Sequence, residues 1–261
     1  MVGEIKINQV TKRFPNYDPK QEDVVALNGF SLDIKPGSFV SLIGPSGCGK
    51  STLLRIIGGL DTASSGEIFL DGNKITKPGS DRGFAFQGSN LFPWLTVEKN
   101  IAFGLKARHI YKEQKGAVDE LVDLVGLKGF EKSFPHQLSG GMQQRASLAR
   151  ALVGHPSVLL LDEPLGALDA FTRMNLQDEI LNIWKKHNMT MIMVTHDVDE
   201  AIYMSDQVVV MSARPSKVEE VIDIDLPRPR ARGQDTFQEY RTRILDVLNL
   251  GGKVEEVEYY L

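Results

Sequence analysis

A glycine-rich octapeptide at residues 44–51, between two regular elements, constrains the fold of this chain more than any other segment. The apolar residues 38–43 precede it and predict a buried strand, and residues 50–57 follow with the pattern of a helix that ends at Gly58 and Gly59. Glycines let a backbone wrap closely around an anion, and the first N–H groups of a helix point positive partial charge at it. A strand, such a loop and a helix together predict a phosphate-binding site on a parallel sheet.

The octapeptide matches the phosphate-loop pattern at every required position. The residues predicted to contact nucleotide phosphates are Gly44, Pro45, Ser46, Gly47, Cys48, Gly49, Lys50, Ser51 and Thr52. Lys50 would bring a full positive charge to the β- and γ-phosphates, and the Ser51 hydroxyl can ligate Mg²⁺. Cys48 needs no redox role, since a small side chain suits such a loop. A glycine turn with an incidental lysine is the simpler alternative, and the flanking strand and helix disfavour it.

Length and composition narrow the kind of protein. The chain has 261 residues, 42% of them hydrophobic, which allows a substantial core in one domain or two. A formal charge of -4 argues against a broad nucleic-acid-binding surface, so we expect no nucleic-acid partner. The single cysteine excludes an intramolecular disulfide. No apolar run approaches the ~20 residues of a membrane span and no signal peptide is recognisable, so we expect a cytoplasmic protein that reaches a membrane only through a partner.

Strand-like and helical segments alternate in the second half of the chain. We expect strands at residues 158–161, 191–195 and 208–211, and helices at residues 171–184 and 198–204. This alternation predicts an α/β fold with a parallel sheet that is covered on both faces. Nearer the N-terminus, apolar residues recur with a period of two around Ile5, Phe30 and residues 67–70, which indicates additional strands of antiparallel type.

Two further segments depart from the alternating pattern. Residues 97–153 are helical in pattern, which predicts a helical insertion into the sheet fold. After Arg214 and Pro215 come a strand-like stretch, a basic run at residues 227–232 and a helix at residues 236–250. The basic run is equally compatible with a solvated surface and with a specific role.

Two carboxylates, Asp162 and Glu163, follow directly after the apolar strand at residues 158–161. Ligands of open α/β sheets bind at the carboxyl ends of the strands, so both should lie beside the phosphate loop. Asp162 is predicted to hold Mg²⁺, and Glu163 to polarise the water that attacks a γ-phosphate. Without a phosphate loop in the same chain, a core strand that ends in a solvated acidic turn would be the better interpretation.

A histidine and a glutamine are weaker candidates for the same edge of the sheet. His196 follows the apolar residues 191–194, and Gln87 follows the strand-like residues 82–86. A lone histidine after a strand is more often structural. Its position after the acidic strand is what favours a catalytic role here, whereas a single glutamine carries no pattern of its own.

The segment Leu138 to Arg145 is the rarest of the motifs. Ser139, Gly140 and Gly141 begin a helix, so a hydroxyl and two bare N–H groups at its N-terminus form a second anion site. An ordinary serine cap before a glycine turn is the simpler alternative. Two phosphate-binding segments and one set of carboxylates in one chain suggest that two chains share two nucleotides.

Together these motifs resemble those of the ATP-binding subunits of ABC transporters, and the resemblance covers nearly the whole chain. It implies a single domain of α/β class over residues 1–261, with a RecA-like P-loop NTPase core, an N-terminal antiparallel β subdomain, a helical subdomain at about residues 97–153 and a C-terminal extension at about residues 213–261. Because the sequence ends at Leu261, we expect no appended regulatory domain. The resemblance implies an ATPase with ATP and Mg²⁺ as cofactors.

The resemblance also implies roles for individual residues. Glu163 would be the general base and His196 would contact the γ-phosphate. Gln87 would be a third catalytic residue and would bind the metal ion together with Ser51 and Asp162. Two copies of the chain would bind ATP head to tail, each phosphate loop facing the partner copy's signature residues. Those residues are Ser139, Gly140, Gly141 and Gln144.

Three assignments from the resemblance lie outside these motifs. Asp169 matches the D-loop aspartate, although Gly166 stands where this loop usually has a serine. Phe14 matches the aromatic residue that stacks on adenine, and Tyr17 is the alternative. Movement of the dimer would reach membrane permease subunits through residues 90–95, where core packing is an equally good interpretation of the aromatic residues.

A narrower resemblance points to importers. Residues 92–97, 213–215 and 225–230 are similar to those of subunits in the nitrate, sulfonate, taurine and bicarbonate group, some of whose relatives carry pyrimidine precursors. It implies a peripheral position on the cytoplasmic face of the membrane, with an external solute-binding protein as an indirect partner. It implies uptake of a small anion such as nitrate, sulfonate, taurine or bicarbonate, and because the solute is contacted by those other subunits, another small solute such as a pyrimidine precursor is the alternative.

Three rival classes are disfavoured. A GTPase would carry the sequence Asn-Lys-x-Asp after the acidic strand. Here the segment Asn73 to Thr76 begins with Asn-Lys, but it lies before that strand and lacks the Asp. A non-transport ATPase that acts on DNA or ribosomes would carry a coiled-coil insertion, and residues 87–138 have no sustained heptads. A regulatory module without turnover would not need both Glu163 and His196.

Overall fold

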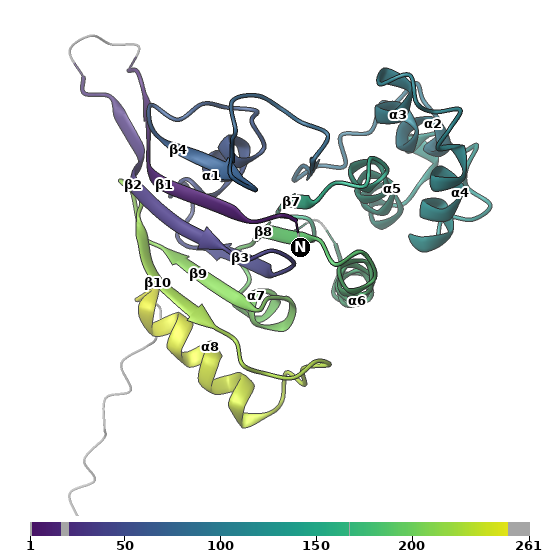
Figure 1. Cartoon of the computed structure of the whole chain (residues 1–261). Coiled ribbons are helices and arrows are strands. Elements are labelled where there is room, and N and C mark those ends of the chain that lie inside the picture. The colour runs from purple at the N-terminus through teal and green to yellow at the C-terminus, as the bar shows by residue number, and fades with distance from the viewer. Residues whose placement is uncertain (1, 17–20, 167, 250–261) are drawn as a thin grey trace, which may run out of the picture.

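Two sheets and eight α-helices form the part of the chain described by the computed structural model, residues 2–16, 21–166 and 168–249 (Figure 1). The strands are β1 (Ile5–Phe14), β2 (Val24–Ile34), β3 (Phe39–Ile43), β4 (Ser65–Leu70), β5 (Asn73–Lys74), β6 (Arg82–Ala85), β7 (Val158–Asp162), β8 (Thr190–Val194), β9 (Gln207–Met211) and β10 (Val218–Asp223). The helices are α1 (Lys50–Ile57), α2 (Val97–Ile101), α3 (Phe103–Ala107), α4 (Lys115–Leu124), α5 (Gly140–Leu152), α6 (Ala170–His187), α7 (Val198–Met204) and α8 (Asp235–Val247), with a 3-10 turn η1 (Pro135–Gln137). Tyr17 and the predicted end of the last helix at Leu250 lie outside the described residues.

The larger sheet has the order β10-β9-β3-β8-β7-β6 and is parallel except for β10, which pairs antiparallel with β9. Every residue of β3, β7 and β8 is buried, as expected for strands covered on both faces. Alternate residues of these strands enter different cores: Leu159 and Met191 pack towards α6, while Leu160 and Ile192 pack towards α1. The alternating pattern of the sequence therefore predicted this sheet correctly.

The smaller sheet is antiparallel, with the order β2-β1-β4-β5. Its residues Ile5, Ile7 and Phe30 share one core with Leu53 of α1, so α1 lies between the two sheets (Figure 1). Helices α2 to α5 occupy residues 97–152, next to α6 at the end of the molecule where β6 and β7 lie (Figure 1). No helix among the described residues is long and apolar enough to cross a membrane.

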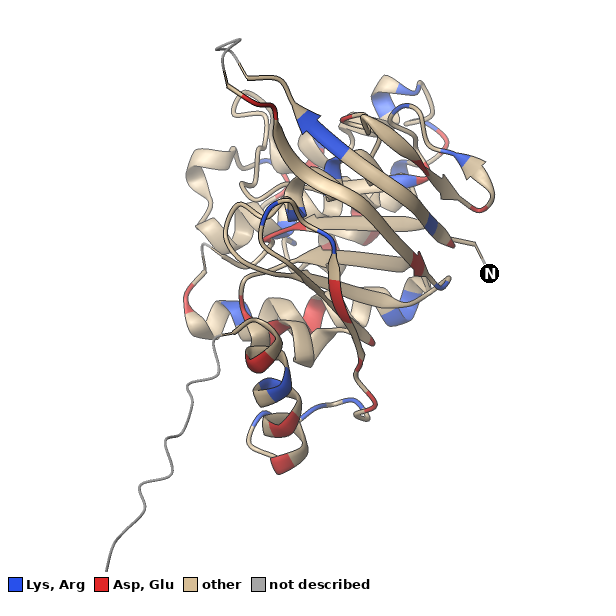
Figure 2. Cartoon of the chain, turned by 90° about the vertical axis from the view of Figure 1, so that its left-hand side faces the viewer, with Lys and Arg blue, Asp and Glu red and all other residues tan. Residues whose placement is uncertain are grey.

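Arginine side chains attach the basic run at residues 227–232 to the rest of the protein. Figure 2 shows basic residues along the segment before α8 and charges of both signs on α8. Arg228 pairs with Asp206 at 2.7 Å, and its guanidinium carbon lies 4.6 Å from the ring centroid of Trp184. Arg232 donates to Gln177 on α6. The run is therefore not a free solvated surface.

Arg230 closes the last turn of α7. Its guanidinium is buried, with the residue 5% exposed, and it donates to the carbonyl oxygens of Ile202, Ser205, Ile224 and Leu226. The last carbonyls of a helix lack partners within the helix, so this side chain supplies donors that the backbone cannot. Burial lowers the pKa of Arg230 to about 10, and the guanidinium therefore stays charged at neutral pH.

Replacement of this buried arginine should be costly. We expect Arg230→Ala to lower the free energy of unfolding by about 2–4 kcal/mol, because several buried carbonyls lose their donor. The matched control is Arg243→Ala, which removes an exposed ion pair with Glu220 on the same extension and should cost no more than about 1 kcal/mol. Urea unfolding of both variants measures the difference, and equal losses would contradict the assignment.

Candidate functional site

The phosphate loop connects β3 to α1 at the carboxyl edge of the parallel sheet. Gly47 and Gly49 have φ of 72° and 117°, which side chains other than glycine rarely adopt. A Cβ atom at Gly49 would lie 3.3 Å from the carbonyl oxygen of Ala26 on β2. The glycine pattern that predicted the loop thus has two causes, the backbone conformation and the close packing of the loop on β2.

Lys50 folds back over the loop. Its Nζ donates hydrogen bonds to the carbonyl oxygens of Gly44 at 2.8 Å and Pro45 at 3.1 Å, and the residue is 7% exposed. Cys48 is buried beneath it, with its sulfur 3.8 Å from Nζ. The lysine charge therefore already lies against the loop that was predicted to hold phosphate.

Ser51 and Asp162 meet at the end of β7. Ser51 Oγ donates to Asp162 Oδ1 at 2.7 Å, and Asp162 is 3% exposed. Burial raises the pKa of this carboxyl group, and the hydrogen bond from Ser51 opposes the shift. A hydroxyl and a carboxylate are the oxygen ligands that Mg²⁺ prefers, and a cation bound there would offset the cost of burying the charge. The two residues thus fit the metal-binding role predicted for them.

The other two predicted catalytic residues, Gln87 and His196, both lie close to one carboxylate oxygen of Glu163. Gln87 Nε2 donates to Glu163 Oε2 at 2.9 Å, and His196 Nδ1 lies 3.5 Å from the same oxygen. Glu163 itself has a positive φ of 46°, and its N–H donates to the carbonyl of Val194 on β8. Residues that follow β6, β7 and β8 therefore converge at one point, as the carboxyl ends of adjacent parallel strands must.

A cavity of about 580 Å³ lies at this edge, and all of its lining residues belong to the predicted site. The lining residues are Ser46, Gly47, Gly49, Lys50, Ser51, Thr52, Gln87, Glu163 and His196. The cavity lining combines backbone donors, a lysine, the Ser51 hydroxyl and a carboxylate, and Asp162 lies behind the lining, hydrogen-bonded to Ser51. This set of groups can bind a phosphate chain and activate a water molecule beside it.

The signature residues do not line this cavity. Ser139 caps α5, its Oγ accepting from the N–H of Met142 at 3.3 Å, and both Ser139 and Gly140 are exposed. Gly141 is buried, and a Cβ atom there would lie 2.8 Å from Thr172 on α6. Gln144 is only 8% exposed. Within one chain, then, the exposed start of α5 does not contribute to the cavity of the phosphate loop.

Phe14 and Asp169 also lie outside the cavity lining. Phe14 ends β1 with 39% exposure, and the Lys12 ammonium lies 5.0 Å from its ring centroid. Asp169 caps α6, where its Oδ1 accepts from the N–H groups of Phe171 and Thr172. Hydrogen bonds from Thr172 lower the pKa of this carboxyl group. Asp169 therefore has a structural role within its own chain, and its role across a dimer remains a prediction.

Arg214 is an additional neighbour of the phosphate loop, and no sequence motif predicted it as a site residue. A Cβ atom at Gly47 would lie 2.8 Å from a guanidinium nitrogen of Arg214. Backbone hydrogen bonds between Ser216 and both Ala26 and Asn28 of β2 hold this arginine's loop in place. The available signal was a basic residue just after β9, because β9 is the neighbour of β3 and their carboxyl ends adjoin.

The fold and the cavity define a P-loop nucleotide-hydrolysing protein, and comparison with family models gives its family. The model described as "ABC transporter" matches residues 27–166. The chain therefore belongs to the ABC transporter family, as an ATP-binding subunit that hydrolyses ATP. The α/β fold, the family and the nucleotide predicted from the sequence are confirmed.

Curated relatives resemble the chain over nearly its whole length. The aliphatic sulfonates import ATP-binding protein SsuB of Bacillus cereus is 52% identical over 252 residues, 96% of this chain and 98% of that protein. The protein of the same name in Bacillus subtilis is 51% identical over 233 residues, 89% of each chain. Among solved structures, the dimeric post-hydrolysis state of the ATP-binding cassette MJ0796 bound to ADP and Pi is 33% identical, with a TM-score of 0.74, and covers 85% of this chain and 100% of that one.

Two glycine substitutions, one in the phosphate loop and one on α3, should have opposite effects on the free energy of unfolding. Gly49→Ala should lower the free energy of unfolding by about 1–3 kcal/mol, because alanine is strained at this φ and its Cβ approaches β2, and it should weaken ATP binding. Gly104→Ala on α3, where a Cβ would meet nothing within 4 Å, should raise stability by about 0.5–1 kcal/mol. Urea unfolding and ATP titration measure both effects. A Gly49→Ala protein as stable as Gly104→Ala would contradict this account of the loop.

Proposed function

We propose that this chain is the ATP-hydrolysing subunit of an aliphatic sulfonate importer, in which two copies share two nucleotide sites. The convergence of Gln87, Glu163 and His196 on a phosphate-binding cavity carries the catalytic part of the proposal. The similarity to SsuB proteins at about half identity supports the solute class. Nitrate, taurine, bicarbonate or a pyrimidine precursor are the alternatives that the test must separate.

The cavity residues divide the chemical work. The loop N–H groups and Lys50 would hold the phosphates of ATP. Ser51, Asp162 and Gln87 would hold Mg²⁺, whose charge offsets that of the phosphates during hydrolysis. Glu163 would accept the proton of the attacking water, since its Oε2 lies at the cavity and already accepts a hydrogen bond from Gln87. His196, with its side chain 66% exposed, would contact the γ-phosphate.

A second copy would complete each site. Its exposed Ser139 and Gly140, with Gly141 and Gln144 behind them, would offer hydroxyl and N–H donors to the phosphates. Asp169 of each copy would contact the other, and Phe14 would stack on the adenine. The dimeric state of the MJ0796 cassette bound to ADP and Pi supports this arrangement, because that cassette shares 33% of its sequence with this chain.

Removal of the proposed general base, Glu163, should trap the ATP-bound dimer. Glu163→Gln should bind ATP yet hydrolyse it at least about a hundredfold more slowly, and should sediment as a dimer with ATP. Addition of Ser139→Arg should return this variant to a monomer, because bulk and charge at the start of α5 block a shared phosphate. Hydrolysis at the wild-type rate by Glu163→Gln would refute the base assignment, and a persistent dimer in the double variant would refute the shared site.

An exposed aromatic cluster suits a permease subunit. Trp94 is 71% exposed, and its ring centroid lies 5.6 Å from that of Phe92, which lies 4.5 Å from that of Phe103. The backbone beneath is fixed by fully buried Asn100, which accepts from the N–H of Phe92 and donates to the carbonyls of Phe92, Leu95 and Thr96. An aromatic residue exposed on a rigid loop is typical of a protein-binding surface.

The same loop is connected to the cavity. Arg150 of α5 donates to the carbonyls of Asn90 at 2.8 Å and Ser89 at 3.1 Å, three and two residues after Gln87. Ser89 donates to Gln143, which belongs to the signature segment. A change at Gln87 on hydrolysis would therefore move the aromatic cluster together with α5. The subunit would sit peripherally on the cytoplasmic face of the membrane, bound to permease subunits and served indirectly by an external solute-binding protein.

Growth of cells tests the solute and the docking surface together. Cells that lack this gene and receive an alkanesulfonate as their only sulfur source should grow when the wild-type gene is restored. Trp94→Ala should not restore growth, although the purified variant should hydrolyse ATP within about twofold of the wild-type rate, since Trp94 is outside the cavity. Val221→Ala on β10, also exposed, is the matched control and should restore growth.

Two results would contradict the proposal in different ways. Growth on alkanesulfonate that does not depend on the gene, with loss of nitrate, taurine, bicarbonate or pyrimidine-precursor uptake instead, would refute the solute class. Full growth with Trp94→Ala would refute the docking surface and leave the solute class intact.

A further inference from the structure

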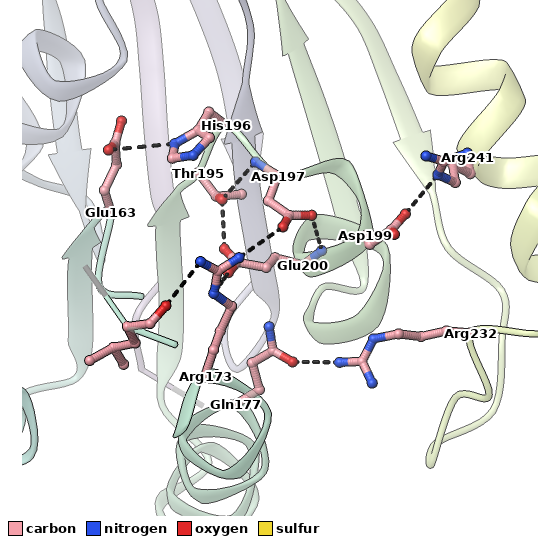
Figure 3. Close-up of polar contacts among 11 residues, drawn as sticks. Glu163, Arg173, Gln177, Thr195, His196, Asp197, Asp199, Glu200, Arg232 and Arg241 are labelled. Carbon is pink, nitrogen blue, oxygen red and sulfur yellow. Dashed lines mark hydrogen bonds and ion pairs between the residues drawn. The ribbon is translucent and has the colours of Figure 1, made fainter. Parts of the chain in front are cut away.

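Arg173, in the first turn of α6, contacts two separate segments, the turn before α6 and the start of α7 (Figure 3). Its Nη2 donates to the carbonyl oxygen of Leu168 at 3.2 Å, in the turn that precedes α6. Its Nη1 donates to Asp197 Oδ2 at 3.4 Å, and its Nε lies 3.6 Å from Glu200 Oε1. One guanidinium thus joins the turn before α6 to the start of α7.

At the start of α7, the residues Thr195, Asp197 and Glu200 are joined to one another by three hydrogen bonds, and His196 lies between the first two of them in the sequence. Asp197 caps α7 by accepting from the N–H of Glu200 at 3.1 Å, and its own N–H donates to Thr195 Oγ1 at 3.0 Å. Thr195 Oγ1 donates to Glu200 Oε2 at 2.7 Å. Glu200 is 5% exposed, and burial raises the pKa of its carboxyl group. The residues on both sides of His196 are therefore fixed, and Arg173 supplies the positive charge beside their carboxylates.

Arg173 also contacts the Leu168–Asp169 turn, which a partner copy would contact in the proposed dimer. Leu168 is followed by Asp169, the D-loop residue, whose carbonyl oxygen accepts from the N–H of Arg173 at 2.9 Å. A shift of this turn would therefore carry the guanidinium with it. Because the guanidinium also holds Asp197, the shift would reach His196, whose Nδ1 lies 3.5 Å from Glu163 Oε2.

We propose that Arg173 is a positioning residue, which makes the orientation of His196 towards Glu163 depend on the position of the Leu168–Asp169 turn. The proposal rests on the catalytic roles proposed for Glu163 and His196. Leu168, Asp197 and Glu200, which Arg173 contacts, do not line the cavity, so ATP binding should not depend on this side chain. A planar guanidinium can serve a carbonyl and two carboxylates at once, whereas a lysine ammonium of the same charge offers one compact donor group.

Steady-state hydrolysis by the purified full-length chain separates this role from nucleotide binding. Arg173→Ala should lower kcat about ten- to a hundredfold, because the histidine is no longer held, and leave KM for ATP within about twofold. Arg173→Lys should fall between this variant and the wild type. Arg241→Ala is the matched control, since Arg241 pairs with Asp199 of α7 at 3.0 Å on the far side from the cavity and should leave both constants unchanged (Figure 3).

A second variant keeps the test decisive if Arg173→Ala does not fold. Asp197→Asn retains an oxygen that can cap α7 but removes the charge that Arg173 contacts, and it should lower kcat in the same direction. The double variant Arg173→Ala, Asp197→Asn should be no slower than Arg173→Ala alone, because both changes break one connection. Thermal unfolding with and without ATP verifies that each variant is folded and binds nucleotide.

Several outcomes would overturn the proposal. An unchanged kcat in Arg173→Ala, a rise in KM without a fall in kcat, or additive losses in the double variant would each show that Arg173 does not act through His196. Glu163→Gln is measured in parallel. If Glu163→Gln is inactive, such a result refutes the positioning role alone, and if it hydrolyses ATP at the wild-type rate, the catalytic assignment itself fails.

Discussion

Burial of β3, β7 and β8 on both faces is the constraint on which the site depends. A strand with apolar neighbours on each side has almost no place for a charged group along its length, so its polar residues gather where it ends. Parallel pairing then brings those ends to one edge. The loop after β3, the carboxylates after β7 and His196 after β8 meet for this reason, although more than a hundred residues separate the first from the last.

The parts of the site that the sequence predicted are those with a local cause. The loop glycines are required by the backbone dihedral angles of the loop itself. Asp162, Glu163 and His196 each stand at the end of an apolar run, and that end is visible in the sequence. The arginines could not be predicted in this way. Arg173 and Arg230 bind carbonyls and carboxylates of other elements, and a pattern along the chain carries no trace of such partners. The basic run at residues 227–232 therefore has two equal interpretations from sequence, and the contacts of Arg230 with the end of α7 decide between them.

The two phosphate-binding segments differ in how complete they are within one chain. The loop at residues 44–51 shares one cavity with Lys50, the Ser51 hydroxyl and the Glu163 carboxylate, and Asp162 is hydrogen-bonded to Ser51. The start of α5 has an exposed serine cap and an exposed glycine. In the part of the chain that the structure describes, neither residue contacts Asp162 or Glu163. The proposed sharing of two sites between two copies would require this asymmetry, since each segment would lack what the other copy offers. In that proposed arrangement, Arg173 would connect the contact between copies to the histidine beside the proposed base.

The four hydrogen bonds of buried Asn100 give the loop before α2 a property that matters when two subunits meet. A loop that is ordered only on contact loses conformational entropy at that moment, and the loss weakens the complex. Here the ordering takes place when the subunit itself folds, so Trp94 is presented in one geometry beforehand. Encounter with a complementary surface would then approach rigid-body association, and the strength of the complex would be set by shape and by the area covered, with little lost to induced fit.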